Sequence, residues 1–332
     1  MRAVLIRAHG GRDRLELADL PRPRPGPGQA VVAVRACGIN HLDVFVRRGM
    51  PGAATPLPHI GGGDIAGVVD EVAPDAQGVG PGQRVLVDPL ITLPGGRLGT
   101  LGENVDGGLC EYIAVDAASL IPLPDDVSFV QAAALPIAYG TAWRMLITRG
   151  RIAAGEHVLI LGAAGGVGTA CVQIAHARGC VVYAAASSQE KLNRLKELGA
   201  DVLVNYTEHP EFHRHIRGLR GGPGVDVVVD YTGATTWVRS LKALNDDGRL
   251  LTCGATSGYD PRTDIRFIWT RELRIIGSDG WRRNDLLALV EAVRAGTVHA
   301  VIDRVLPLEE VAEAHRLLED REVVGKVVIG IA

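Results

Sequence analysis

The hydrophobic and polar positions along the chain change rhythm near residue 125. Before that point, short runs that alternate apolar and polar residues are broken by glycine and proline, which is typical of strands in a half-buried sheet or small barrel. These runs are AVVAVRACGI (30–39), DIAGVVDEVA (64–73), QRVLVD (83–88) and CEYIAV (110–115). The N-terminal part of the chain is therefore predicted to be all-β.

After residue 125, strand and helix patterns alternate. Near-continuous apolar strands separated by helices, such as QEKLNRLKELGA (189–200), predict a parallel sheet that is covered on both faces. Six such strands fit a doubly wound dinucleotide-binding fold. The six runs stand at 157–161, 180–185, 201–205, 225–230, 249–254 and 273–277.

The C-terminal tail repeats the alternation once more. A helical pattern at 286–296 is followed by a strand at 301–308, a helix at 309–320 and a strand at 325–331. This tail is short, and we expect it to rejoin the N-terminal domain. The predicted fold class is thus α/β, with a doubly wound parallel sheet over 126–279 and a β-rich domain formed by 1–125 and 280–332.

Length, charge and cysteine usage narrow the class of protein. The 332 residues accommodate two domains, and a formal net charge of −3 gives no footprint for nucleic acid or an anionic membrane. No apolar run approaches the roughly 18 residues that span a bilayer, and the N-terminus lacks the apolar stretch of a signal peptide. The five cysteines form no Cys-x-x-Cys pair, which argues against a disulfide framework. We expect a cytoplasmic protein with a small-molecule partner and no nucleic-acid or membrane partner.

A glycine-rich segment, GAAGGVG (162–168), directly follows the strand that ends at Leu161. Glycines permit the backbone to approach a pyrophosphate where a Cβ would collide with it, and the helix that follows offers free N–H groups at its N-terminus. Glycine turns also join strands to helices for purely steric reasons. Here strand, turn and helix stand in the right order within a six-strand series, which predicts dinucleotide binding through Gly165, Gly166 and Val167.

The second strand of the series ends without the acidic residue that an NAD-preferring site places there. Ala184, Ala185 and Ala186 supply no carboxylate for a ribose 2′-hydroxyl, whereas Ser187 and Lys191 suit a 2′-phosphate. The pattern favours NADPH. In an alternative interpretation, Ser187 caps the next helix and Lys191 is a solvated surface charge. Tyr206, after the third strand, is predicted to pack near the same phosphate, although an ordinary half-buried tyrosine would explain it equally well.

Several segments, taken in order, resemble the medium-chain dehydrogenase/reductase superfamily and, within it, the zinc-independent quinone oxidoreductase branch. The resemblance covers nearly the whole chain and implies a GroES-like β-barrel catalytic domain, a Rossmann domain that binds NADPH, and a homodimer formed through strand 273–277. It also implies that Thr141 and Gly254 contact the cofactor. The segments are GINHLDVFVRRG (38–49), GGGDIAGVVDEV (61–72), AAALPIAYGTAW (132–143), AAGGVG (163–168), VDVVVDYTG (225–233) and GKVVIGI (325–331).

The resemblance also bears on zinc. Zinc-dependent alcohol dehydrogenases of this fold take their catalytic ligands from positions that match Asn40, Gly63 and the segment IAYGT (137–141) here. A catalytic zinc needs about three N, S or O donors, and these positions do not supply them. The segment 89–108, where relatives hold a structural zinc, contains no cysteine. We therefore predict no metal, with a substitute set of Cys37, His41 and His59 as a less favoured alternative.

Without a Lewis acid, the natural remaining reaction is hydride transfer from NADPH to a quinone or an enone, with hydrogen bonds stabilising the enolate oxygen. The predicted catalytic residues are Asn40, as an amide donor, His41, as a donor or proton relay, and Asp43, for which a structural role is favoured. The tyrosines that relatives place near Phe45 and Met50 are missing, so the proton donor stays open. Two alternatives also stay open: an alcohol dehydrogenase with an atypical metal site, and an NADPH-binding sensor or structural protein with little turnover.

Overall fold

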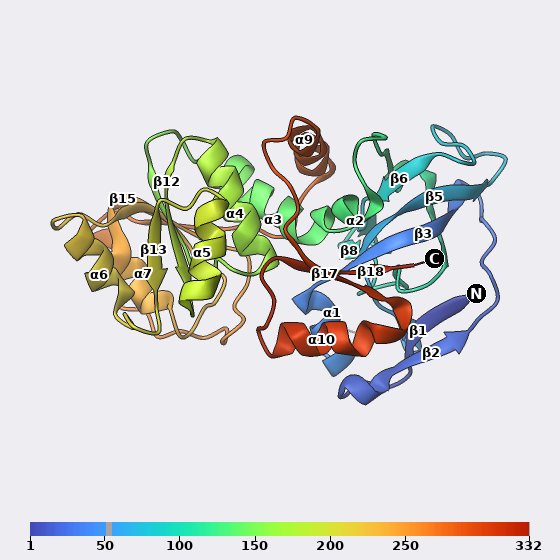
Figure 1. The fold of residues 1–332 in the computed structure, drawn as a ribbon, viewed down its shortest axis with the longest axis horizontal. Coiled ribbons are helices and arrows are strands. Elements are labelled where there is room, and N and C mark those ends of the chain that lie inside the picture. Colours follow the sequence, from blue (N-terminus) through green and yellow to red (C-terminus); the bar gives the residue numbers. More distant parts are fainter. Residues whose placement is uncertain (51–54, 332) are drawn as a thin grey trace. The chain divides into compact units, whose positions relative to one another are not determined.

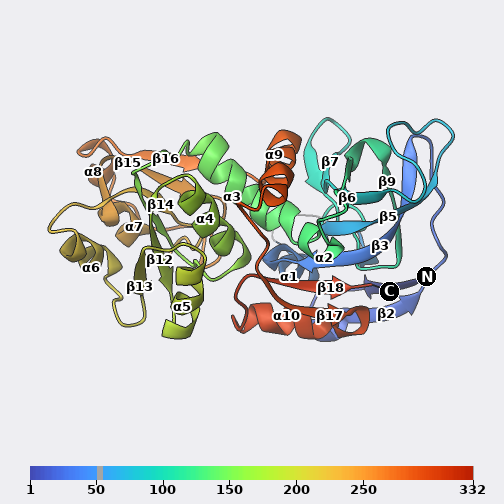
Figure 2. The same cartoon turned by 45° about the horizontal axis from the view of Figure 1, so that its top comes forward.

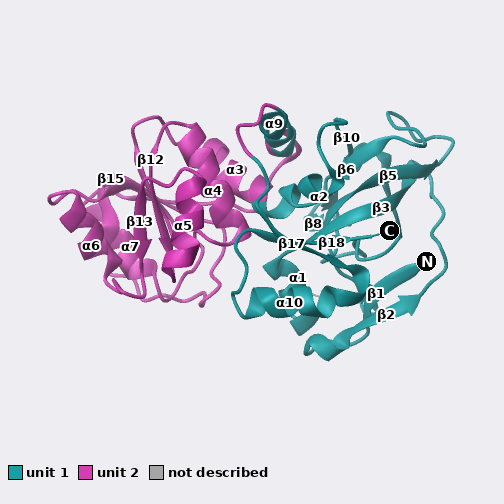
Figure 3. Ribbon diagram, viewed as in Figure 1, with its two compact units in different colours: residues 1–138, 286–294, 299–332 teal, residues 139–285, 295–298 magenta. Residues whose placement is uncertain are grey.

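A computed structural model describes residues 1–50 and 55–331 of the chain. The chain divides into two compact units, shown in different colours in Figure 3. Unit 1 comprises residues 1–138, 286–294 and 299–332, and unit 2 comprises residues 139–285 and 295–298.

The boundaries of the units differ from those predicted at 125/126 and 279/280. Residues 126–138 belong to unit 1, where Gln131 exchanges two hydrogen bonds with the backbone of Ala300 and the Ile137 N–H donates to Asp64. Residues 280–285 belong to unit 2, where Asp285 accepts from the Arg144 guanidinium. In each case a long-range hydrogen bond crosses the boundary that the change in hydrophobic pattern predicts.

Unit 2 contains a parallel sheet with the strand order β13-β12-β11-β14-β15-β16. This is the doubly wound order, in which the chain starts in the middle of the sheet and winds outwards in both directions. In Figures 1 and 2, α4 and α5 lie on one side of the sheet, and α6 and α7 lie on the other. Its strands are β11 (His157–Ile160), β12 (Val181–Ala186), β13 (Val202–Asn205), β14 (Val225–Val229), β15 (Leu244–Thr252) and β16 (Arg274–Gly277). Its helices are α3 (Thr141–Trp143), the π-helix η4 (Arg144–Arg149), α4 (Gly166–Ala177), α5 (Gln189–Glu197), α6 (Phe212–Leu219), α7 (Trp237–Ala243) and α8 (Arg266–Trp269).

All six predicted strands of unit 2 are confirmed, with β15 starting five residues earlier than its apolar run. The central strands are buried because helices cover both faces of the sheet, whereas the edge strand β16 is largely exposed. Leu159, Val204, Val228 and Leu250 have no exposed surface and pack in one cluster with side chains of the covering helices, including Phe212.

Unit 1 is built mainly from antiparallel strands. Its largest sheet has the order β10-β6-β5-β3-β18-β17, with β9 also paired to β3, and smaller sheets join β2-β1-β4 and β7-β8. The strands are β1 (Arg2–Ile6), β2 (Leu15–Asp19), β3 (Gln29–Ile39), β4 (His59–Ile60), β5 (Asp64–Val72), β6 (Arg84–Val87), β7 (Leu90–Thr92), β8 (Leu98–Thr100), β9 (Tyr112–Asp116), β10 (Leu120–Pro122), β17 (Ile302–Pro307) and β18 (Lys326–Gly330). The helices are α1 (His41–Arg48), α2 (Phe129–Ala132) and α10 (Val311–Glu319), with short 3-10 turns η1 (Arg12–Arg14), η2 (Ala117–Ser119) and η5 (Leu308–Glu310). The π-helix η3 (Leu135–Gly140) and α9 (Arg283–Arg294) contribute residues to both units.

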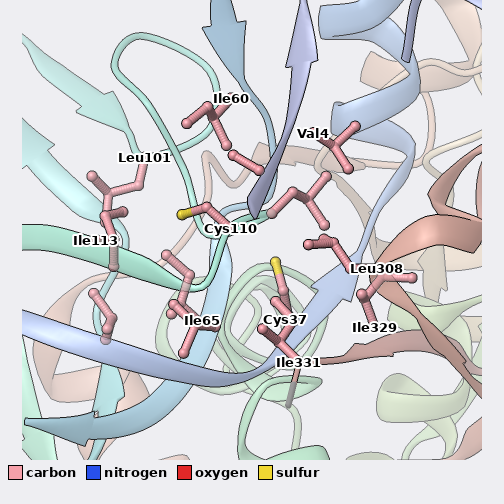
Figure 4. Close-up of a cluster of buried hydrophobic side chains, with 14 of the residues drawn as sticks. Val4, Cys37, Ile60, Ile65, Leu101, Cys110, Ile113, Leu308, Ile329 and Ile331 are labelled. Carbon is pink, nitrogen blue, oxygen red and sulfur yellow. The ribbon is translucent and has the colours of Figure 1, made fainter. Parts of the chain in front are cut away.

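The C-terminal tail rejoins the N-terminal part of the chain, as the sequence predicts. β18 pairs antiparallel with β3, so that Val328 lies opposite Gly38. Figure 4 shows the apolar core that results, in which Cys37 of β3 lies near Ile329 of β18 and Leu308. The pairing places the first residue of β18, Lys326, beside the end of β3, where the predicted catalytic segment begins.

Within residues 1–50 and 55–331, no helix is both long enough and apolar enough to cross a membrane.

Candidate active site and cofactor site

The glycine turn of unit 2 joins β11 to α4 with almost no side-chain volume. Gly162 adopts a left-handed φ of 60°, and Gly165 stands at the N-cap of α4, where it has no side chain to cap the helix. A Cβ on Gly168 would lie 2.6 Å from backbone atoms of Ala163, so this helix packs against the turn at a distance that only glycine allows. The first N–H groups of α4, at Gly166 and Val167, stand at a helix N-terminus, where an anion is favoured.

Asp230 and Tyr231, which directly follow β14, were not identified from the sequence: Tyr231 supports the glycine turn, and Asp230 holds the loop after β14. The Tyr231 hydroxyl donates to the Gly162 carbonyl over 2.9 Å and so fixes the start of the turn. Asp230 is completely buried, and its carboxylate accepts hydrogen bonds from the Thr236 and Ser240 hydroxyls and from two backbone N–H groups of the following loop. Only the tertiary structure brings Tyr231 to the turn, although both residues stand in the quoted segment VDVVVDYTG.

The predicted 2′-phosphate residues gather at the ends of β12 and β13. These strands are parallel neighbours, with Ala186 beside Asn205, so Ser187 and Tyr206 follow the two strands at the same edge of the sheet. The interpretation of Ser187 as a helix cap is wrong: Ser188 is the N-cap of α5, and its hydroxyl accepts from the Lys191 N–H over 3.4 Å. Ser187 is exposed and does not cap α5.

Thr141 and Gly254 lie in different parts of unit 2. Thr141 is almost buried and begins α3, between the π-helical stretches η3 and η4. Such π-helical turns are rare in proteins, and those that occur are often found at functional sites. Gly254 follows β15 at the carboxyl edge of the sheet, where doubly wound folds bind their ligands.

The residues of unit 2 fit a pyridine dinucleotide. The uncapped N-terminus of α4, with glycine at the turn, leaves room and donors for a pyrophosphate. Ser187, Tyr206 and Lys191, which follow β12 and β13, suit the adenosine half of the dinucleotide. β12 and β13 lie on one side of β11 in the sheet, and β14 to β16 lie on the other. When bound, such a cofactor supplies or accepts a hydride.

In unit 1, Asn40 is the N-cap of α1 and is almost buried, with 8% of its surface exposed. Its amide Nδ2 donates to Asp64 Oδ2 over 2.8 Å, and its Oδ1 accepts from the Lys326 ammonium over 2.5 Å. The other contact of Nδ2, to the Gly38 carbonyl, is 3.5 Å long and therefore weak. The N–H in this weak contact is therefore the one that another acceptor would compete for.

Asp64 and Lys326 form a buried ion pair that the sequence did not reveal. Their side chains are 0% and 2% exposed, and Lys326 Nζ lies 3.0 Å from Asp64 Oδ2. The ammonium also donates to the Ile39 carbonyl over 2.9 Å, and Asp64 Oδ1 accepts from the Ile137 N–H over 2.7 Å. Both charges are therefore matched by hydrogen bonds, as burial requires.

Asp43 holds the backbone around Asn40. One carboxylate oxygen accepts from the Asn40 N–H over 2.7 Å and the other from the Gly62 N–H over 2.9 Å. Burial, with a smaller contribution from nearby Asp64, raises the pKa of Asp43 to about 6, although the two N–H donors and Lys326 act to lower it. Since both oxygens are engaged by the backbone, this geometry is that of a positioning residue.

The remaining predicted residues of unit 1 do not converge. His41 is exposed, with its ring 6.4 Å from that of Phe45, whereas Cys37 is completely buried. The His59 imidazole is hydrogen-bonded to the Gly102 carbonyl over 2.9 Å. Within the described ranges, no three His, Cys, Asp or Glu side chains are arranged to hold a metal ion.

The fold and these residues define a nucleotide-dependent oxidoreductase with a separate β domain, and comparisons with known proteins specify it further. The family model "Alcohol dehydrogenase GroES-like domain" matches residues 26–125, and "Zinc-binding dehydrogenase" matches residues 166–295. The quinone oxidoreductase of Pongo abelii is 31% identical over 99% of this chain and 97% of its own length.

Solved structures agree on the fold. A crystal structure of an NAD-dependent alcohol dehydrogenase is 42% identical, with a TM-score of 0.94 over the whole of both chains. A crotonyl-CoA carboxylase/reductase in complex with NADP is 26% identical, with a TM-score of 0.91 over 99% of this chain and 94% of that one. The chain belongs to the medium-chain dehydrogenase/reductase superfamily and is a pyridine-nucleotide-dependent oxidoreductase. The predicted family and fold class are thus confirmed.

Proposed function

We propose that this chain is an NADPH-dependent reductase that transfers hydride to a quinone or an α,β-unsaturated carbonyl compound without zinc. The observation that carries the proposal is the Asn40 amide, which lies between the Lys326 ammonium and the Asp64 carboxylate. An ammonium on Oδ1 polarises the amide and strengthens its remaining N–H as a donor. Such a preorganised donor stabilises the negative charge that develops on the acceptor oxygen.

Each of the other residues has a defined part in this proposal. Asp43 and Lys326 fix the backbone and the side chain of Asn40, and so act as positioning residues. His41, next to Asn40 and exposed, is the proposed relay for the proton that the reduced acceptor takes up. The similarity to a quinone oxidoreductase supports the acceptor class.

The preference for NADPH rests on the end of β12. Ala184 to Ala186 offer no carboxylate to a ribose 2′-hydroxyl, while Ser187 and Tyr206 follow their strands at the same edge of the sheet and Lys191 lies in the first turn of α5. The printed descriptions of similar structures include both an NAD-dependent enzyme and an NADP complex, so the comparison allows either cofactor. A Lys191→Gln variant should raise KM for NADPH and leave KM for NADH unchanged.

The proposal is tested by following NADPH oxidation with a panel of quinones and short enones in the presence of a strong chelator. Asn40→Asp keeps the shape of the side chain but removes the donor, so kcat should fall by about 10²- to 10³-fold with KM for NADPH unchanged. Asn40→Ala provides a second variant that adds no buried charge. An unchanged kcat in both variants would refute the role of Asn40.

Two other results would favour the alternative functions. Alcohol oxidation that the chelator abolishes would indicate an alcohol dehydrogenase with an atypical metal site. Tight NADPH binding without turnover of any acceptor would indicate a binding protein.

We also propose that the chain forms a homodimer through strand 273–277. β16 is the terminal strand of its sheet, it pairs with β15 on one side, and Ile275 is 39% exposed. An open strand edge with an exposed apolar residue readily pairs with another strand. Light scattering should give the mass of two chains, and Ile275→Lys should shift it towards that of one.

A further inference from the structure

A cavity of about 410 Å³ lies within unit 2, beside the last two strands of its sheet, β15 and β16 (Figure 2). Four of the residues that line it are arginines, and among the described residues none of its lining is acidic. The arginines are Arg149, Arg151, Arg249 and Arg274. We call this space the arginine cavity, and its volume is that of a site for a small molecule.

The arginine cavity lies towards the amino ends of these strands, away from the edge that binds the dinucleotide. Arg249 of β15 is in register with Arg274 of β16, three residues before the last aligned pair, Thr252 and Gly277. At about 3.3 Å per residue, the two arginines stand roughly 10 Å from the carboxyl edge of the sheet. Doubly wound folds bind dinucleotides at that carboxyl edge. The arginine cavity is therefore distinct from the cofactor site.

Most of the positive charge in the cavity has no carboxylate partner. Arg249 forms an ion pair with Glu156 over 2.6 Å. The guanidinium groups of Arg149 and Arg274 each donate to a backbone carbonyl over 3.1 Å. The exposed side chain of Arg151 forms neither a hydrogen bond nor an ion pair within the part of the chain that the structure describes. Such a concentration of unpaired positive charge favours an anion.

The backbone holds two of these arginines at the sheet. A Cβ on Gly150, which separates them, would lie 2.5 Å from the Leu251 side chain and 2.7 Å from the Met145 carbonyl oxygen. The end of η4 thus packs against β15 at a distance that only glycine allows. Arg151 itself has a left-handed φ of 50°, which is costly for a residue with a Cβ and is found most often at functional sites.

The arginine cavity does not depend on the proposed dimer. Arg274 and Ile276 line it from β16, whereas Ile275, between them, lies on the other face of the sheet because side chains alternate along a strand. A dimer formed through β16 would use the backbone groups at the edge of this strand. Pairing of the edge therefore does not require the Arg274 guanidinium.

We propose that the arginine cavity binds two adjacent phosphate groups of a small-molecule ligand other than the dinucleotide. Guanidinium groups present paired N–H donors that match the oxygens of a phosphate group. Two adjacent phosphate groups offer enough oxygens and enough charge for the three guanidinium groups that lack a carboxylate, those of Arg149, Arg151 and Arg274.

Calorimetric titration of inorganic pyrophosphate into the full chain, with the cofactor site filled by saturating NADP⁺, tests the proposal. We expect one site per chain, with an affinity that falls about tenfold or more in Arg151→Gln and again in Arg274→Gln. Both side chains are exposed, so both variants should fold, and Arg151→Gln should leave KM for NADPH unchanged. Arg178→Gln, which removes an exposed arginine at the end of α4, is the matched control and should change the affinity less than twofold.

Three results would overturn the proposal. The first is no pyrophosphate binding at millimolar concentration when NADP⁺ is bound. The second is a loss of affinity in Arg178→Gln as large as that in Arg151→Gln, which would indicate attraction to the surface in general. The third is pyrophosphate binding that Lys191→Gln weakens and Arg151→Gln does not, which would assign it to the cofactor site. Inorganic phosphate should bind at least tenfold more weakly than pyrophosphate, and equal affinities would contradict a site for two phosphate groups.

Discussion

The buried pair of Lys326 and Asp64 makes the sharpest stability prediction. Lys326→Met keeps the length of the side chain but removes three hydrogen bonds, to Ile39, Asn40 and Asp64. It leaves the Asp64 carboxylate completely buried, with the N–H donors of Ile137 and Asn40 as its remaining partners. Removing one partner of a buried ion pair costs about 3 to 5 kcal/mol, a large part of the roughly 5 to 15 kcal/mol that stabilise a domain.

The assay must report on unit 1. All four tryptophans, at positions 143, 237, 269 and 281, lie in unit 2, so tryptophan fluorescence does not follow this change. Amide hydrogen exchange of peptides from β3 and β18 does, because these strands pair with each other beside the ion pair. A loss of 3 to 5 kcal/mol should lower their protection factors by about 10²- to 10⁴-fold.

Two further variants make the prediction refutable. Lys196→Met removes an exposed lysine of α5 and should leave the exchange of β3 and β18 unchanged. The double variant Asp64→Asn with Lys326→Met removes both charges, so it should be protected better than Lys326→Met alone. A fall of less than tenfold in the single variant, or additive losses in the double variant, would refute this account of the pair.

Three other predictions concern the turn, the titrating acid and a helix cap. Gly168→Ala places a Cβ 2.6 Å from the backbone of Ala163 and should lower dinucleotide affinity, measured by NADPH titration, at least tenfold. In Gly165→Ala the new Cβ meets only one oxygen, at 3.6 Å, so this variant should fold normally. A loss of NADPH binding in Gly165→Ala would therefore report a close approach of the ligand to this glycine. The pKa of Asp43 is about 6, above its ordinary 3.8, so the folded chain holds this proton more tightly than the unfolded chain. This group should therefore add about 2 kcal/mol to the free energy of unfolding as the pH falls from 6 to 4, and denaturant titrations of Asp43→Asn should lack that rise. Ser188→Ala removes the N-cap of α5 and should lower its stability by about 1 kcal/mol, measured by hydrogen exchange within the helix.

The sequence predicted the strands of unit 2, because the central ones are apolar on both faces and form short uniform runs; the polar first half of β15 was missed. The return of the tail to the N-terminal domain was also predicted, but its partner strand β3 was not. The domain boundaries were not predicted: within their units, Gln131 and Asp285 are hydrogen-bonded to residues more than 130 positions away. Local hydrophobic pattern carries no information on such bonds.

The candidate site likewise contains parts that the sequence predicted and parts that it did not. The glycine turn is one continuous segment, and its strand-turn-helix order is visible in the sequence. Lys326 and Asp64 are 262 positions apart, and each stands at the start of a strand, where its type gives no sign of burial. Ser188, rather than Ser187, caps α5, because the start of a helix is fixed by backbone geometry that two adjacent serines do not distinguish.

The ion pair beside Asn40 is difficult to explain by stability alone. Burying two charges costs desolvation energy, and well-packed apolar residues of similar volume are often as stable or more so. Apolar residues cannot fix the orientation of an amide by hydrogen bonds. Lys326 and Asp64 do so, because Lys326 donates to the Oδ1 of Asn40 and Asp64 accepts from its Nδ2. The double variant Asp64→Asn with Lys326→Met therefore separates the two roles. If the pair exists to orient the donor, this variant should regain the hydrogen-exchange protection of unit 1 and still show the low kcat of Asn40→Asp. A double variant that regains both would assign the pair to folding alone.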